Sequence, residues 1–272
     1  MEPAHLTDRA VIALAGAEAR SFLQGLVTND VEALVPGKAL YAALLTPQGK
    51  ILFDFFVVEG EGALLLDCAG VAAEALVKRL KLYRLRAKVE IELRPQLGVY
   101  IVLAGHPDNR PVPYADRAVS FDDPRLEGLP RRSIGAIAEM PAGLPGPEAY
   151  HALRRKLGVP ESGDFGSDHI FALDAGLDEL RAVSFDKGCY VGQELTARMK
   201  HRGTARKRLL MVKGAGALTL GAHITGKGEI GEIAAVHDAE GFALIRLDRL
   251  AEDAGPYAAG DVAVTISKPA FL

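Results

Sequence analysis

Cysteine is scarce in this chain, and its scarcity excludes two kinds of protein. The 272 residues contain two cysteines, Cys68 and Cys189. Small secreted domains that depend on disulfides carry several pairs, so a disulfide framework is excluded. The sequence has no C-x-x-C pair and no cluster of cysteine and histidine. A structural zinc site, which needs four ligands of these types, is therefore not expected.

Long apolar runs and a strong excess of one charge are also missing. No uninterrupted apolar stretch approaches the roughly 20 residues that cross a bilayer. Residues 1–5 lack the cationic start and apolar core of a signal peptide. The net charge is −3 and the pI is near 6.2, which argues against a general binder of nucleic acid or membranes. We expect a cytoplasmic globular protein with no direct nucleic-acid or membrane partner.

The most informative stretch spans residues 186–203, DKGCYVGQELTARMKHRG. Cys189 follows a lysine and precedes a run of good helix formers, 193–202. A neighbouring cation and a helix N-terminus both favour thiolate over thiol and so lower a cysteine pKa. Gly188 and Gly192 suit a tight loop that presents the sulfur, and Gly203 stands where a helix commonly ends. These features predict a reactive or ligand-forming thiol at Cys189.

The alternative is that Cys189 is a small buried hydrophobe in a glycine-bearing turn, which is the usual state of a free cysteine. The lysine and the glycines beside it weigh against that interpretation. Cys68 has no such neighbours and ends an apolar strand. We expect Cys68 to be a core residue.

The run Lys187-Gly188-Cys189-Tyr190-x-Gly192-Gln193-Glu194, followed by Ala197-Arg198 and Arg202-Gly203, resembles the signature of the YgfZ family. These folate-binding proteins are similar to the T-protein (aminomethyltransferase) of the glycine cleavage system. The segments 22–31, 41–50 and 85–89 resemble other blocks of the family. Together the matches extend from about residue 6 to the last strands.

The resemblance implies an α+β protein with a GcvT-like three-lobed fold. Residues 1–204 would form the folate-binding N-terminal region, with a ferredoxin-like segment inserted at about 48–105. Within that segment the pattern reads strand, strand, helix, strand, strand. After residue 204 the chain consists of short apolar strands separated by glycine turns. That pattern predicts a small C-terminal β-barrel over 205–272, for which five strands can be recognised.

The family's role, as the resemblance implies it, is to bind tetrahydrofolate or a related folate and to assist iron–sulfur cluster assembly or repair. Iron–sulfur carrier or client proteins would be the partners, with effects on tRNA-modifying methylthiotransferases downstream. Cys189 would be the reactive group and a shared ligand of a transient cluster, and Lys187 would lower its pKa or offset cluster charge. The remaining motif residues would hold the loop: Gly188, Tyr190, Gly192, Gln193, Glu194 and Arg198.

Two further residues are candidates for the folate site. The resemblance implies that Asn29 lines the folate cavity, although Thr28-Asn29-Asp30 is also a typical turn with local backbone hydrogen bonds. Asp174 stands near the place where the family has a carboxylate that holds the pteridine ring. An N-cap of a helical piece at 175–180 explains Asp174 equally well. Asp54, a single carboxylate in an otherwise apolar strand, needs a partner or a polar cavity.

An enzyme is the alternative function. In aminomethyltransferases an aspartate activates the folate, and by alignment on the strand 64–67 it would fall within 68–74. No aspartate stands there, which argues against aminomethyl transfer. A folate-dependent aminomethyltransferase or demethylase-like enzyme is the second hypothesis, and a cysteine-based redox protein without folate the third.

The sequence also contains a basic cluster, made of Lys78, Arg79, Lys81, Arg84, Arg86 and Lys88. A solvated helix face is its simplest explanation. An anion site for a polyglutamyl tail and a surface for an acidic protein are the other two interpretations.

Overall fold

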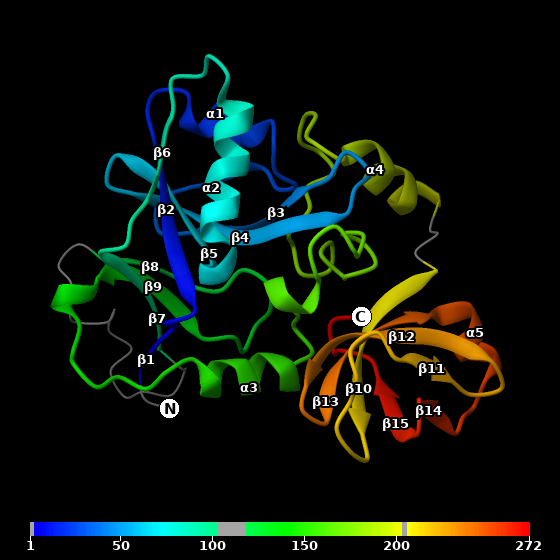
Figure 1. The fold of residues 1–272 in the computed structure, drawn as a ribbon. Coiled ribbons are helices and arrows are strands. Elements are labelled where there is room, and N and C mark those ends of the chain that lie inside the picture. The colour runs from blue at the N-terminus through cyan, green and yellow to red at the C-terminus, as the bar shows by residue number, and fades with distance from the viewer. Residues whose placement is uncertain (1–2, 103–117, 203–205) are drawn as a thin grey trace. The chain divides into compact units, whose positions relative to one another are not determined.

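The structure, a computed structural model, describes residues 3–102, 118–202 and 206–272. The chain folds into two compact units (Figure 1). The first unit comprises Met1–Leu44, Phe53–Leu153 and Leu180–Val191, and the second comprises Leu45–Leu52, Arg154–Glu179 and Gly192–Leu272. Gly203 and the last residues of the expected ferredoxin-like segment, 103–105, lie outside the described residues.

The first unit contains a five-stranded antiparallel sheet in the order β3-β4-β5-β2-β6. Side chains alternate between the two faces of a strand, and alternate positions such as Phe55, Val57, Leu64 and Leu66 therefore share one face and enter one apolar core. Helices α1 and α2 and the short 3-10 helix η1 belong to the same unit. The strands are β2 (Arg9–Ala15), β3 (Ala39–Leu45), β4 (Ile51–Gly60), β5 (Ala63–Ala69) and β6 (Glu90–Leu93), and the helices are α1 (Ala19–Gln24), η1 (Val31–Ala33) and α2 (Gly70–Arg84).

A second antiparallel sheet of the first unit has the order β1-β7-β9-β8. The segment expected to be ferredoxin-like therefore does not form a sheet of its own. Strand β2 lies between β5 and β6, and β7 pairs with β1 and β9. The elements are β1 (Ala4–His5), β7 (Leu97–Val102), β8 (Val119–Phe121), β9 (Arg131–Ala136), the 3-10 helix η2 (Ile137–Glu139) and α3 (Glu148–Lys156), whose last turn belongs to the second unit.

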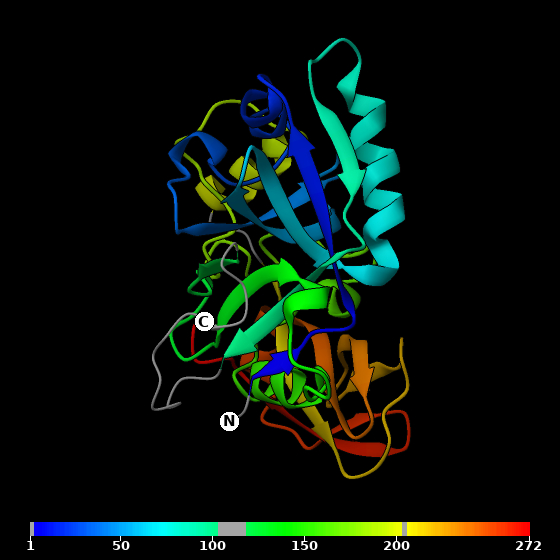
Figure 2. The ribbon, with the colours of Figure 1, turned by 90° about the vertical axis from the view of Figure 1, so that its left-hand side faces the viewer.

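Helix α2 packs one face on the five-stranded sheet through Ala73, Leu76 and Leu80. Figure 2 shows the helix beside the sheet, with its other side facing away from the strands. The three buried positions recur at helical spacing, as expected for a helix that covers one face of a sheet.

The second unit contains a closed antiparallel barrel in the order β10-β13-β12-β11-β14-β15. The expected C-terminal barrel is thus confirmed, with six strands rather than five. Tyr257–Ala259, the strand that the sequence pattern did not reveal, is only three residues long. The elements are η3 (Ser162–Asp164), α4 (Gln193–Arg202), β10 (Lys207–Gly214), β11 (His223–Thr225), β12 (Glu229–His237), β13 (Glu240–Arg246), α5 (Leu247–Glu252), β14 (Tyr257–Ala259) and β15 (Val262–Ser267). No helix in the described ranges has the length and apolar character needed to span a membrane.

Candidate functional site

The motif lysine is buried against a loop that lies far away in the sequence. Lys187 is 7% exposed, and its Nζ donates hydrogen bonds of 2.7 Å to the carbonyl oxygens of Gln24, Val27 and Asn29. An ammonium has three donors, so all three are satisfied here. Burial lowers the pKa of Lys187 to about 8, an effect that nearby Asp30 opposes. The geometry gives Lys187 an anchoring role, and its expected influence on the Cys189 thiol stays a prediction.

Further hydrogen bonds join the chain before the motif to the same loop. The buried hydroxyl of Thr28 donates to the carbonyl of Ala182 at 2.6 Å and accepts from the amide of Ala43 at 2.9 Å. The amide of Ser184 donates to the carbonyl of Thr28 at 2.9 Å. These bonds hold residues 181–187 in a defined position on the first unit.

Asn29 uses its side chain for the same purpose. Its amide nitrogen donates to the carbonyls of Tyr41 and Arg181, each at 2.8 Å, and its oxygen accepts from the amide of Asp30 at 2.9 Å. Only the bond from Asp30 is the local bonding that a Thr-Asn-Asp turn predicts, whereas the bonds to Tyr41 and Arg181 join distant parts of the first unit. A contact between Asn29 and a folate stays a prediction.

The cysteine of the motif is accessible, and its reactivity stays a prediction. Cys189 is a free, exposed cysteine, and its sequence neighbour Tyr190 is buried with its ring centroid 5.2 Å from Nζ of Lys187. The sulfur is therefore presented between two buried side chains. Cys68 is different: it lies in the core of the first unit, and burial raises the pKa of its thiol to about 12.

The two glycines of the motif do not have the same role. Gly192 has φ +83°, and a Cβ built there would lie 2.5 Å from the carbonyl oxygen of Thr46. A side chain is excluded at that distance. Gly188 has open space around its Cβ position and no left-handed φ, so the expected need for glycine holds at Gly192 and is wrong at Gly188.

Helix α4 spans Gln193–Arg202, as the run of helix formers predicted, and starts four residues after Cys189. Glu194 and Arg198 form the expected i,i+4 ion pair on its surface. Both side chains are exposed, so the pair adds only about 0.3–0.5 kcal/mol to stability. In the first turn of the helix, the hydroxyl of Thr196 donates a hydrogen bond to the carbonyl of Gly192 at 3.0 Å.

The second unit contains a cavity of about 580 Å³. Its apolar wall includes Phe171 and Met199, and Asp174 contributes a carboxylate that is 6% exposed. The lining also includes four basic side chains, Lys50, Arg206, Lys207 and Arg246, and the carboxylates of Glu229 and Glu232. The full lining is Lys50, His169, Phe171, Asp174, Leu195, Met199, Arg206, Lys207, Glu229, Gly231, Glu232, Leu244 and Arg246.

Asp174 is the buried carboxylate of this cavity. Burial raises its pKa to about 6, although Arg208 and Lys207 oppose the shift. Residues 175–180 form turns and not a helix, so the N-cap interpretation of Asp174 is wrong. Its backbone carbonyl accepts from the amide of Leu209 at 2.7 Å, which fixes the residue beside the first barrel strand. The residue thus lines the cavity from a fixed position, and a contact of its carboxylate with a folate ring stays a prediction.

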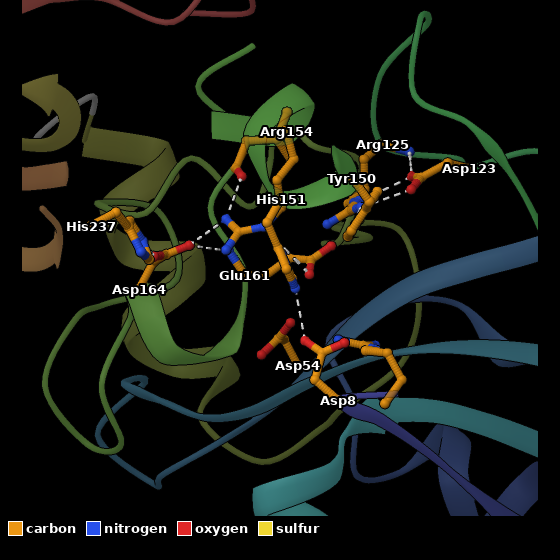
Figure 3. A network of polar contacts seen from close by, with 12 residues as sticks. Asp8, Asp54, Asp123, Arg125, Tyr150, His151, Arg154, Glu161, Asp164 and His237 are labelled. Atoms are coloured by element: carbon orange, nitrogen blue, oxygen red, sulfur yellow. Dashed lines mark hydrogen bonds and ion pairs between the residues drawn. The ribbon is translucent and has the colours of Figure 1, made fainter. Parts of the chain in front are cut away.

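The first unit also contains a buried charge network that the sequence did not reveal. Arg132 donates to Asp67 at 2.8 Å, and Arg9 donates to the other oxygen of Asp67 at 2.6 Å. The guanidinium of Arg125 donates two hydrogen bonds, of 2.7 and 2.9 Å, to the carboxylate of Asp123. Figure 3 shows this pair. Each of these carboxylates is matched by a guanidinium, which is how buried charges are tolerated.

Aromatic rings complete this network. The guanidinium of Arg132 lies 4.1 Å from the centroid of Phe56, and that of Arg125 lies 4.7 Å from it. The phenol of Tyr150 accepts from Arg125 at 2.9 Å and from Arg132. Phe56 alternates with the core residues of β4 and so occupies the opposite face of the strand.

Asp54 shares that face, and the partner that its sequence context required is Tyr41. The phenol of Tyr41 donates to the Asp54 carboxylate at 2.8 Å. Both residues are at positions of β3 and β4 that alternate with the apolar core. Asp54, a single carboxylate in an apolar strand, was therefore the one feature of the sequence that indicated a polar face on this side of the sheet.

The C-terminal barrel matches a family model described as the CAF17 C-terminal β-barrel domain, over residues 206–272. Over the whole length, the glycine cleavage system aminomethyltransferase T from Bartonella henselae is similar in structure, with a TM-score of 0.74 and 15% sequence identity. The similarity covers 99% of this chain and 86% of that one. The expected α+β, GcvT-like fold with a C-terminal barrel is thus confirmed.

Curated relatives are iron–sulfur cluster assembly factors. The mitochondrial factor IBA57 of Mus musculus is 35% identical over 78% of this chain and 66% of its own length. The corresponding factor of Homo sapiens is 34% identical over 76% of this chain and 65% of its own length. A homologue from Neurospora crassa is 32% identical over 75% of this chain and 52% of its own length. This chain thus spans between about half and two thirds of these relatives.

Proposed function

Because this chain is a homologue of the IBA57 iron–sulfur cluster assembly factors, we propose that it is an accessory protein in the assembly or repair of iron–sulfur clusters. The observation that carries the proposal is the exposed Cys189, which stands two residues after a lysine whose three donors are all bonded to the loop 24–29. A fixed, accessible thiol can bind iron without a large rearrangement of the chain.

The cluster is proposed as cargo and not as a resident cofactor. Iron–sulfur clusters are normally held by four ligands. Within the described residues, no three His, Cys, Asp or Glu side chains gather in a way that could hold a metal ion. Cys189 would supply one thiolate, and a carrier or client protein would supply the others. Clients of the methylthiotransferase class that modify tRNA, and a cytoplasmic location, remain parts of this proposal.

We also propose that the cavity of the second unit binds tetrahydrofolate or a related folate. Its volume of about 580 Å³ is within the range of small-molecule sites. The amino and ring N–H groups of a pteridine match the buried carboxylate of Asp174, and Phe171 offers an apolar contact. Lys50 and Arg246, also in the lining, would attract the carboxylates of a glutamyl tail. The folate would supply a one-carbon carrier ring.

Anaerobic reconstitution tests the cluster proposal. Purified wild type and Cys189→Ser are mixed with a cluster-loaded iron–sulfur carrier, and cluster binding and transfer are followed by visible absorption and circular dichroism. We expect Cys189→Ser to lose the cluster signal of the complex and to bind tetrahydrofolate normally. Cys68→Ala is the matched control, because Cys68 is buried and should not contact the cargo.

Two results would contradict the proposal. One is an unchanged cluster signal in Cys189→Ser. The other is catalytic turnover of a methylamine donor with tetrahydrofolate by both proteins, which would favour the folate-dependent enzyme instead.

A further inference from the structure

Helix α2 carries a second apolar stripe on the side opposite to its buried face. Ala73, Leu76 and Leu80 pack into the core of the first unit. The outer stripe consists of Val71, Ala75 and Leu82 of the helix and of Leu85, which directly follows the last helical residue; Val71 is 101%, Leu82 64% and Leu85 88% exposed. The helical positions, with Lys78 between Ala75 and Leu82, repeat with the alternating spacing of a helix–helix seam.

The charges around this outer stripe are positive except for Glu74. Lys78 lies within the stripe in the helical repeat, and Arg79 and Lys81 flank it on either side. With Arg84 and the single acid Glu74, helix α2 has a net charge of +3, whereas the whole chain has −3. The positive charge is therefore concentrated on this helix.

A shallow hollow runs beside the outer stripe. It has a volume of about 540 Å³ and includes Leu82 of the helix and Leu93 of β6, the last strand of the sheet. Val77, Lys78, Lys81 and the single acid Glu74 also line it, so the lining has two cations and one carboxylate. An exposed apolar surface of this kind, rimmed by charge, is typical of a protein-binding site.

We propose that the outer stripe of α2 is a docking surface for an acidic amphipathic helix of a partner protein. Leucine-type side chains of the partner would pack on Leu82 and Leu85, and carboxylates on its flanks would pair with Lys78, Arg79 and Lys81. Helix-in-groove recognition uses the same combination of spaced apolar anchors and flanking charge.

Two other occupants fit the stripe less well. A second copy of this chain would place one α2 against another, each with a net charge of +3, and like charges at such a contact repel. A membrane surface favours a wide apolar face with aromatic residues. The outer stripe has no aromatic residue and contains Lys78.

The test uses the full chain and a fluorescein-labelled helical peptide of three heptads, with leucine at the two seam positions and glutamate at the flanking ones. Binding is measured by fluorescence anisotropy for wild type, Leu82→Glu, the double variant Lys78→Glu/Lys81→Glu, and Lys38→Glu. Lys38 is an exposed lysine outside the stripe and serves as the matched control. All substituted side chains are exposed, and circular dichroism checks that each variant is folded.

We expect wild type and Lys38→Glu to bind the acidic peptide equally, with affinity that falls as salt is added. Leu82→Glu and the double charge reversal should each weaken binding by about tenfold or more. Equal binding by all four proteins, or equal binding of a lysine version of the peptide, would refute the proposal. It would also fail if anionic vesicles, and not the peptide, bind in a Leu82-dependent way, or if sedimentation shows a dimer that Leu82→Glu dissociates.

Discussion

The ammonium of Lys187 donates a 2.7 Å hydrogen bond to the backbone carbonyl of Asn29, across 158 residues of sequence. The sequence analysis assigned Lys187 to thiol activation and Asn29 to folate binding. In the structure the side chain of Lys187 contacts the backbone of Asn29. This contact explains how a short motif can have a fixed position on the first unit. We therefore expect the lysine to be needed for the position of the motif loop that carries Cys189.

Replacing Lys187 by methionine should therefore destabilise the protein. The variant keeps the chain length of the side chain but leaves the carbonyls of Gln24, Val27 and Asn29 without their donor. A buried hydrogen bond to a charged group contributes about 1.5–3 kcal/mol, and the three bonds are not additive, so we expect a loss of about 2–4 kcal/mol. Urea unfolding measures the change.

Lys38→Met is the control for that measurement, because Lys38 is exposed; its effect should stay within about 0.5 kcal/mol. Hydrogen exchange should show that residues 24–29 and 181–187 lose protection together in Lys187→Met. Unchanged exchange in both segments would show that the lysine does not anchor the motif.

Alanine substitutions at the two motif glycines should have opposite outcomes. Gly192→Ala places a Cβ 2.5 Å from the carbonyl oxygen of Thr46 at a left-handed φ, which we expect to cost about 2–4 kcal/mol. Gly188→Ala meets open space and should change stability by less than about 0.5 kcal/mol. Thermal unfolding of the two variants measures both changes in stability. Equal melting temperatures would contradict the different roles of Gly188 and Gly192.

The sequence predicted those parts of the protein that depend on local patterns. Alternating and helical periodicity located most strands and indicated one helix between the second and third strands of the segment 48–105, which the structure has at 70–84. Glycine turns indicated the barrel. The helix expected at 175–180 did not form, and Gly176 with φ +77° lies in the turns that replace it. Local propensity could not show that tertiary contacts hold this segment in turns.

The candidate site was predictable only as a list of residues. Cys189 and Asp174 could be proposed from the motif and its resemblance, whereas the partners of Lys187 could not. Those partners are backbone carbonyls of residues 24–29. Every residue has a backbone carbonyl, so the sequence cannot indicate which ones bind the lysine. Similarly, arginine is usually found on the surface, and the sequence does not indicate that Arg132 is buried. In the structure Arg132 is 0% exposed and bonds Asp67.

Asp174 should make stability depend on pH. Burial raises its pKa to about 6 in the folded protein, from an ordinary value of 3.8. The folded state thus keeps a proton that the unfolded chain loses between these values, and stability falls as pH rises from about 4 to 6. Asp174→Asn removes this cost, so it should be more stable than wild type by about 1–3 kcal/mol at pH 7 and equal to it near pH 4.

Guanidinium-chloride unfolding at the two pH values measures this difference. The same variant should bind tetrahydrofolate more weakly at pH 7, since the amide replaces one of the two acceptor oxygens of the carboxylate by an NH₂ donor and carries no charge. A variant that is less stable than wild type at pH 7 would show that Asp174 has a structural partner and is not a ligand group.

The buried charge network provides the last prediction. Arg132→Met removes the guanidinium that bonds Asp67 and Tyr150 and stacks on Phe56. Removing one partner of a buried ion pair costs about 3–5 kcal/mol. Asp67 keeps its hydrogen bond to Arg9 in this variant, so we expect a loss at the lower end of that range, about 3 kcal/mol. Arg131→Met is the control, since Arg131 is exposed and its nearest acid, Asp122, lies 3.9 Å away on the surface. Chemical unfolding should show a loss of at most about 0.5 kcal/mol for Arg131→Met. Comparable losses in both variants would mean that the buried pairs contribute no more to stability than a surface contact.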